Sequence, residues 1–243
     1  MAEGAELLRT ALRDGVPVES VYLAPEGVND SEVQAVCQQA ADAGARLFQL
    51  GPGVLERVAN TVTPQPVLAV LPMLEHDDAM LTAAPPPGSL LVVLVDVRDP
   101  GNAGTVLRTA DAAGVRGVVF SGDSVDPYNP KTVRASAGSL FHVPFSVHGD
   151  APGLATSLAA AGFRTLASSS HDGQDYTQLD WTVPTAVFLG NESAGLDAAA
   201  TAATSASVAI EMEGRAESLN VGVACAVICF EALRQRRSAA PQP

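Results

Sequence analysis

The sequence is short of positive charge, of cysteine and of long apolar runs. It has 14 Lys and Arg against 27 Asp and Glu, a formal net charge of −13. This balance disfavours a nucleic-acid partner unless basic side chains gather locally, because phosphates bind Lys and Arg. The longest apolar run, residues 221–230, falls short of the roughly 18 residues that span a bilayer. The acidic start, residues 1–6, has no hydrophobic targeting stretch, so we expect a soluble cytoplasmic protein with no membrane partner.

Side chains for disulfide and metal chemistry are also scarce. Cys37, Cys225 and Cys229 are odd in number and form no C-x-x-C pair, which favours buried core thiols over a disulfide framework or a zinc site. The four histidines share no metal-ligand spacing: His76, His142, His148 and His171. The sequence therefore predicts no metal site.

The composition otherwise predicts a folded chain in two parts. Its 243 residues are 47% hydrophobic and 17% charged, enough for a sizeable core. The sharpest break is Ala-Ala-Pro-Pro-Pro-Gly-Ser at 83–89, where three prolines lack the N–H groups that a helix or central strand needs. We interpret it as a linker between a first domain, 1–82, and a second, 90–243. Residues 1–84 carry most of the net negative charge, −8 of −13, with 4 basic and 12 acidic side chains.

Hydrophobic patterns predict an α/β fold in both parts. The first part alternates helical patterns at 5–13 and 30–43 with extended ones at 18–23, 47–50 and 67–71. The second opens with Leu90–Val95, typical of a strand buried on both faces of a parallel sheet. Strands are then predicted at 118–120, 163–167, 183–189 and 208–210, and helices at 103–113 and 218–236. Because parallel sheets bind ligands at the carboxyl ends of their strands, the loops after 95, 189 and 210 are the place to look.

Each of these three loops has unusual content, although none is diagnostic alone. In residues 99–108, glycines permit a tight turn and Asn102 suits a helix cap, but neither G-x-G-x-x-G nor a P-loop is present. In residues 190–196, Ser193 lacks the G-x-S-x-G spacing of a serine hydrolase, and Glu192 also suits a helix cap. In residues 211–220, Ser218 is the expected N-cap of the last helix, which places Asn220 inside its first turn.

Taken in order, the three loops resemble the three motifs of the SpoU, or TrmH-type, RNA ribose methyltransferases. The first motif is Asn102-x-Gly104-x-x-x-Arg108 running to Gly114, followed by Pro130-Lys131 and Arg134-Ala135-Ser136-x-Gly138. The second is Leu189-Gly190-Asn191-Glu192 through Gly195-Leu196, and the third runs from Ile210 to Ser218-Leu219-Asn220-Val221. The resemblance covers residues 90–237. Residues 3–75 also look like the small ribosomal-protein-like α/β domain that many members use to recognise their substrate.

The resemblance implies a parallel-sheet domain tied in a deep trefoil knot, an exception to the usual absence of knots. Members bind S-adenosylmethionine in a bent form in the knot and work as homodimers, with the site completed across the subunit interface. By position, the cofactor would be held chiefly by main-chain groups of Leu189, Gly190, Ile210, Leu219 and Asn220.

The implied reaction moves a methyl group from the sulfonium of the cofactor to a ribose 2′-hydroxyl of structured RNA. The catalytic residues of the family correspond to Asn102, Arg108, Glu192, Ser218 and Asn220. Because a guanidinium stays charged at neutral pH, we expect Arg108 to bind a substrate phosphate and to stabilise developing alkoxide charge. Asn102 and Glu192 would orient Arg108, while Ser218 and Asn220 would shape the loop beside the sulfonium.

RNA contacts are expected from basic residues in and near the first motif, namely Arg98, Arg116, Lys131 and Arg134. Their small number and the net charge of −13 predict weak, salt-sensitive binding. The first domain favours ribosomal over transfer RNA. The alternatives are a transfer-RNA 2′-O-methyltransferase, a ribosomal RNA methyltransferase that gives self-resistance to an antibiotic, and a non-catalytic knotted RNA-binding protein. One departure from the family is Ile210-Glu211-Met212 in place of Ile-Pro-Met, which adds a carboxylate near the cofactor loop.

Overall fold

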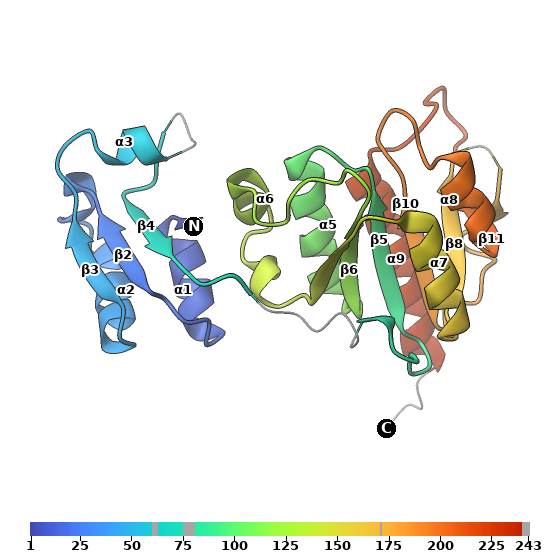
Figure 1. The fold of residues 1–243 in the computed structure, drawn as a ribbon, viewed down its shortest axis with the longest axis horizontal. Helices are drawn as coiled ribbons and strands as arrows, with labels where there is room; N and C mark the ends of the chain where they lie inside the picture. The colour runs from blue at the N-terminus through green and yellow to red at the C-terminus, as the bar shows by residue number, and fades with distance from the viewer. Residues whose placement is uncertain (60–62, 75–80, 171, 240–243) are drawn as a thin grey trace.

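The computed structural model describes residues 1–59, 63–74, 81–170 and 172–239, which form two sheets (Figure 1). The smaller sheet has the strand order β1-β4-β2-β3, and the larger one β7-β6-β5-β10-β8-β11-β9. The small sheet uses strands between residues 2 and 70, and the large one strands between residues 90 and 209. The α/β class is therefore as predicted, while the proposed domain boundaries around the 83–89 linker stay a prediction.

The first sheet carries two helices on one face. Its strands are β1 (Ala2–Glu3), β2 (Ser20–Leu23), β3 (Arg46–Gln49) and β4 (Val67–Val70); its helical elements are α1 (Ala5–Arg13), η1 (Pro25–Gly27), α2 (Ser31–Asp42) and α3 (Leu55–Val58). Val21 of β2 lies in one buried cluster with Leu8 of α1 and Val36 of α2. The Asp30 carboxylate caps α2 by accepting two backbone N–H groups of its first turn. The predicted helices and strands of this part are confirmed, with ends shifted by one or two residues.

The second sheet is parallel at every strand pair. Its strands are β5 (Leu90–Val95), β6 (Gly117–Ser121), β7 (Phe145–His148), β8 (Arg164–Ser169), β9 (Gln174–Asp175), β10 (Thr185–Leu189) and β11 (Ala206–Ala209). Its helical elements are α5 (Pro100–Ala113), α6 (Pro130–Ala135), η2 (Ser139–Phe141), α7 (Ala151–Ala160), α8 (Ala198–Ala203) and α9 (Val221–Ala239). The sequence patterns did not predict β7, β9, α6, α7 or α8.

Helices cover both faces of this sheet. All six residues of β5 are buried, as its apolar run predicts. Its even-numbered residues pack in the layer of α5 and α9, and its odd-numbered residues pack in the layer of α7 and α8. The carboxyl ends of the strands therefore meet at one edge between the two helical layers, which is where ligands of such sheets bind (Figure 1).

The two sheets are joined through α1. A Cβ atom on Gly138 would lie 2.6 Å from the Thr10 side chain, so only glycine lets η2 approach α1 this closely. The His142 ring lies between two carboxylates: its Nε2 contacts Asp14 at the end of α1, and its Nδ1 lies 3.0 Å from Oδ2 of Asp111 in α5. The small sheet is therefore docked onto the helical layer that contains α5.

Candidate active site

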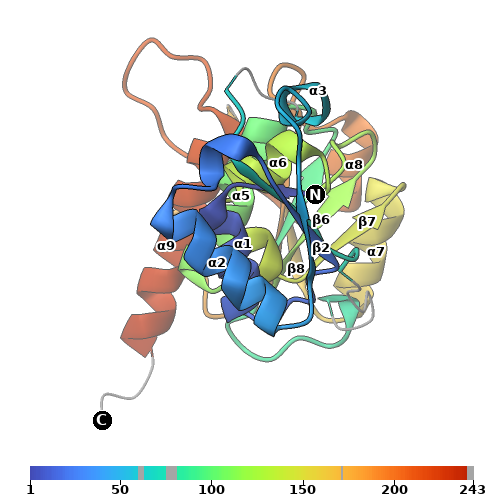
Figure 2. The same cartoon turned by 90° about the vertical axis from the view of Figure 1, so that its left-hand side faces the viewer.

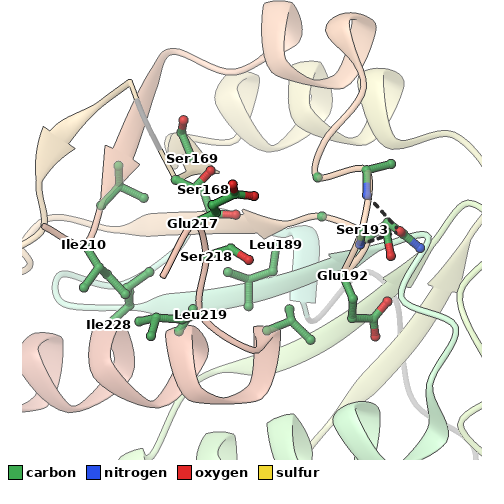
Figure 3. Close-up of a pocket in the computed structure, with 18 of the residues that line it drawn as sticks. Ser168, Ser169, Leu189, Glu192, Ser193, Ile210, Glu217, Ser218, Leu219 and Ile228 are labelled. Carbon is green, nitrogen blue, oxygen red and sulfur yellow. Dashed lines mark hydrogen bonds between the residues drawn. The ribbon is translucent and has the colours of Figure 1, made fainter. Parts of the chain in front are cut away.

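The second and third motif loops line a cavity at the carboxyl edge of the large sheet (Figure 3), and the first motif loop joins them through hydrogen bonds of Asn102. The cavity has a volume of about 310 Å³. Apolar side chains from the ends of β10, β11 and α9 line one part of it: Leu189, Ile210, Leu219 and Ile228. Polar groups line the rest, among them Ser168 and Ser169 at the end of β8.

The loop after β10 is held in a tight bend by its own backbone. Asn191 and Gly195 exchange two backbone hydrogen bonds of 3.0 and 2.9 Å. A Cβ atom on Gly190 would lie 2.2 Å from the carbonyl carbon of Gly195, so this position accepts no side chain. The Asn191 amide donates to the Asp96 carbonyl at 2.8 Å and so ties the bend to the loop after β5. Asn191 stands in the second motif, but the sequence analysis gave it no role.

Asn102 connects the other two motif loops. Its Nδ2 donates to Oε1 of Glu192 at 2.8 Å, and its Oδ1 accepts from Nδ2 of Asn220 at 2.8 Å. The expectation that Asn102 caps its helix is wrong, because Oδ1 of Asp99 accepts the Asn102 N–H at 2.8 Å and is the N-cap of α5. Asn102 therefore lies within the first turn of α5, where its side chain is free to reach both loops.

Asn220 is the N-cap of α9. Its Oδ1 accepts the N–H groups of Gly222 at 2.9 Å and Val223 at 3.3 Å, and its carbonyl accepts the Ala224 N–H at 2.9 Å. The predictions that Ser218 caps the helix and that Asn220 lies inside it are therefore wrong: the cap lies two residues further along the chain. One amide thus begins α9 with its oxygen and holds Asn102 with its nitrogen.

Most predicted cofactor residues line the cavity. Leu189, Gly190, Ile210 and Leu219 do so, and so do the predicted catalytic residues Glu192 and Ser218. Asn220 lies beside the cavity, between the lining residues Leu219 and Val221. Arg108 lies on the exposed side of α5, outside the lining residues and without a hydrogen bond or ion pair to any described residue. The structure of one chain therefore does not show Asn102 or Glu192 orienting Arg108.

Three of the four predicted RNA-binding residues lie at the edge of the sheet that holds the cavity. Arg98 follows β5 and pairs with Asp123 at 3.3 Å, while Lys131 and Arg134 lie in α6, which follows the carboxyl end of β6. Arg116 instead precedes β6, and its N–H donates to the Leu90 carbonyl at the amino end of β5. The structure does not bring Arg116 to the site.

The cavity suits a cationic, partly apolar ligand. Its charged lining residues, within the described part of the chain, are the carboxylates Glu192 and Glu217. A sulfonium is attracted by such carboxylates, and an adenine ring suits the apolar side chains. No group of three or more His, Cys, Asp or Glu that could hold a metal ion occurs in the residues described, and none of the described helices is long and apolar enough to cross a membrane.

The fold and the site together define an α/β protein with a ligand cavity at the carboxyl ends of the strands of a parallel sheet. Residues 89–230 match the SpoU rRNA Methylase family, and residues 1–76 match the family described as RNA 2′-O ribose methyltransferase substrate binding. The chain belongs to the SpoU rRNA Methylase family, which confirms the resemblance seen in its three motifs.

Individual relatives agree over nearly the whole chain. The 23S rRNA (guanosine(2553)-2′-O)-methyltransferase RlmP of Bacillus subtilis is 33% identical over 95% of this chain and 86% of its own length. A 23S rRNA (uridine(2479)-2′-O)-methyltransferase of Streptomyces viridochromogenes is 38% identical over 83% of this chain and 69% of its own. The crystal structure of the SpoU methyltransferase AviRb from the latter organism, in complex with AdoMet, superposes with a TM-score of 0.85 at 29% identity, covering 98% of this chain and 91% of that one.

Proposed function

We propose that this protein transfers a methyl group from S-adenosylmethionine to a ribose 2′-hydroxyl of ribosomal RNA. The observation that carries the proposal is the cavity lined by the second and third motif loops, together with Asn102 of the first motif, which joins Glu192 to Asn220. The names of the two rRNA methyltransferase relatives and the AdoMet complex of the matching structure support the substrate and the cofactor.

The cofactor end of the cavity is assigned to main-chain groups. Gly190 has no side chain because its Cα lies against the Gly195 backbone, and it lines the cavity together with Ile210 and Leu219. S-adenosylmethionine, when bound, supplies a methyl group activated by the sulfonium charge. The carboxylates of Glu192 and Glu217 complement that charge, and Ser218 and Asn220 hold the loop beside it.

The ribose hydroxyl is a weak nucleophile as the neutral alcohol, so positioning and charge stabilisation supply most of the catalysis. We assign to Arg108 the binding of a substrate phosphate and the stabilisation of developing negative charge on the hydroxyl oxygen. The proton then leaves late, to water or phosphate. Arg108 does not line the cavity of its own chain, and this role needs a second chain.

A homodimer would supply that second chain. Two apolar side chains on α9 are about half exposed, Val223 at 49% and Phe230 at 48%. The helix that carries them lies next to α5, because a Cβ atom on Gly222 of α9 would meet the Thr105 side chain at 2.9 Å. Thr105 and Arg108 share the exposed side of α5. A second copy seated on this face would cover both apolar side chains and carry Arg108 toward the cavity of its partner.

Three further assignments belong to the same proposal. The segments after β10 and β11 that enclose the cavity form the trefoil knot of the family. Residues 1–82 recognise the substrate, residues 83–89 link the two domains, and residues 90–243 catalyse the reaction. The protein acts in the cytoplasm, where ribosomal RNA is modified.

The test is nucleoside mapping by mass spectrometry of total RNA from cells with and without this gene. We expect one 2′-O-methylated nucleotide of ribosomal RNA to disappear, to return with the wild-type gene, and not to return with Arg108→Ala. Arg237→Ala, which removes an exposed arginine near the end of α9, is the matched control and should restore the modification. Loss from transfer RNA would establish the alternative substrate, and unchanged ribosomal and transfer RNA would contradict the proposal.

A further inference from the structure

The first sheet carries an aromatic pair next to its β3 edge, on the face opposite α1 and α2. Val21 and its neighbours pack against α1 and α2, so the side chains that alternate with them point the other way. Tyr22 of β2 and Phe48 of β3 are opposite each other in the strand register and stack with ring centroids 5.2 Å apart at 16°. Figure 2 shows α1 and α2 together on one side of β2, with α3 beyond the end of the strands.

This aromatic pair remains accessible. Phe48 is 42% exposed, and Tyr22 is partly buried against the small cluster that Leu55 of α3 forms with Leu68. The exposed part of the Phe48 ring gains no stability from burial, so packing of this domain does not explain that part. The stacked rings offer a flat apolar surface about the size of a nucleobase, and every base can stack on such a surface.

A positive charge lies on the same face of the sheet as the aromatic pair. Arg46 is opposite Ser20 in the same register and stands two residues before Phe48, hence on the same face. It has no ion pair among the described residues, whereas Arg9 and Arg13 are paired with carboxylates. The carboxylates of α1 and α2 lie on the helix side of the sheet. Glu56 and Arg57 in α3 add one charge of each sign beside it.

The row of residues that contains the aromatic pair runs across the sheet toward α6. Across the sheet, Phe48, Tyr22, Leu68 and Glu3 form one row of cross-strand neighbours. Three strand spacings of roughly 4.8 Å separate the ends of this row, about 14 Å. Glu3 is neutralised by Arg134 of α6 at 3.4 Å, and Lys131 is exposed on the same helix. Leu68 is buried and the Glu3 side chain is only 11% exposed, so the Phe48 end of the row is the part open to a ligand.

We propose that Tyr22 and Phe48 form a stacking platform for an unpaired base of the RNA substrate, with Arg46 contacting the phosphate next to it. The inference rests on the proposed function for the identity of the substrate and adds how the first domain reads it. It favours RNA with splayed-out bases, because a duplex hides the faces of its bases.

The test uses the full chain and a single-stranded 12-nucleotide RNA that carries one 2-aminopurine, whose fluorescence falls on stacking. Phe48→Ala should raise the Kd at least about five-fold and abolish the quenching, since stacking on one aromatic side chain contributes that much or more. Leu47→Ala is the matched control. Leu47 directly precedes Phe48 in the same strand, is 47% exposed, and points to the other face of the sheet. It should change the Kd by less than about two-fold, and Phe48→Tyr should retain quenching.

Two further measurements test the phosphate contact of Arg46 and distinguish the stacking platform from the proposed methyl transfer. Arg46→Gln should make the slope of log affinity against log salt shallower by about 0.7, the value for one phosphate contact on a single strand. Transfer of labelled methyl groups from S-adenosylmethionine to total ribosomal RNA is followed in parallel. Equal Kd values for Phe48→Ala and Leu47→Ala, or no quenching by the wild type, would overturn the platform even if methyl transfer persists. Quenching that depends on Phe48, without methyl transfer to any RNA, would instead remove the proposed reaction and keep the platform.

Discussion

Asn102 holds two other candidate catalytic residues, one with each end of its amide. Both hydrogen bonds are 2.8 Å long, and one of them goes to a carboxylate. Hydrogen bonds to charged groups contribute about 1.5–3 kcal/mol. We expect Asn102→Ala to lower the Tm by several degrees, because these hydrogen bonds are lost, and to lower the single-turnover rate of methyl transfer about 10- to 100-fold at a temperature where the variant is folded. Ala112→Ser, an exposed change on the same helix, is the control; a full rate in Asn102→Ala would show that the three side chains act independently.

His142 makes the contact between the domains sensitive to pH. The hydrogen bond with Asp111 raises its pKa most, burial lowers it, and the hydrogen bond with Asp14 raises it again, for a net rise. Burial raises the pKa of Asp14, but its hydrogen bonds with His142 and Arg13 outweigh this and leave it lowered. For a histidine with a raised folded-state pKa, the stabilisation is complete below its ordinary value near 6.5 and disappears as pH rises through the folded value.

We therefore expect His142→Gln to cost more stability in acid than in base. A partly exposed pair of this kind contributes up to about 1 kcal/mol, which corresponds to a fall in Tm of about 2–4 °C at pH 5.5 for a chain of this size. At pH 8.5 the fall should be under about 1 °C. Thermal melting at the two pH values measures this, and equal losses at both would show that the ring acts through packing alone.

Single residues were the least predictable part of the site. The motif residues themselves were identifiable, because their types and spacing are specific to the family. Which of Ser218 and Asn220 caps α9 was not, since both residue types are good N-caps. The choice depends on Asn102, which is 118 positions away in sequence and holds the nitrogen of the Asn220 amide.

The exposed side of α9 is the element on which the proposed dimer depends. Phe230→Glu would place a charge where a second copy should bury an apolar ring, at a large cost in association. We expect this variant to be monomeric and to lose methyl transfer while S-adenosylmethionine still binds. Light scattering after gel filtration gives the mass, and Val147→Glu is the control, because Val147 is 62% exposed on β7. A dimeric Phe230→Glu variant would move the interface elsewhere.

Elements were predictable where their apolar pattern was strong. The continuous run of β5 and the alternation in the first domain fall within two residues of the observed strands. α7 and α8 were missed because Ala151–Ala160 and Ala198–Ala203 are dominated by alanine and small residues, which leave little contrast between a buried and an exposed side. α6 and β9 are too short to have a period, and their conformation depends on tertiary contacts.

At the scale of the whole molecule, the net charge of −13 leaves few cations for an RNA substrate, and two of them, Arg98 and Arg134, are paired with carboxylates. The exposed cations assigned to RNA are few, so binding should be weak and steeply dependent on salt. With two to five phosphate contacts, the slope of log affinity against log salt should lie between about −1.4 and −4.5. Fluorescence anisotropy with a ribosomal RNA fragment over a range of KCl concentrations gives this slope, and a value near zero would exclude recognition through phosphates.

The division into two α/β parts could be inferred from the proline-rich break and the change in pattern, but their docking could not. It depends on single residues far apart in the sequence, such as Gly138 against Thr10 and His142 between Asp14 and Asp111. None of these has a local signal, because a close approach of backbone to side chain depends on the three-dimensional position of both elements.

The double use of the Asn220 amide makes assembly of the site visible in hydrogen exchange. The N–H protons of Gly222 and Val223 are protected by the oxygen of the same amide whose nitrogen binds Asn102. Fraying of the first turn of α9 and loss of the Asn102 contact are therefore coupled openings, and whatever steadies Asn102 should slow exchange at both amides. Two backbone protons at the start of one helix thus report, without any substrate, how much of the time the three motif loops are joined.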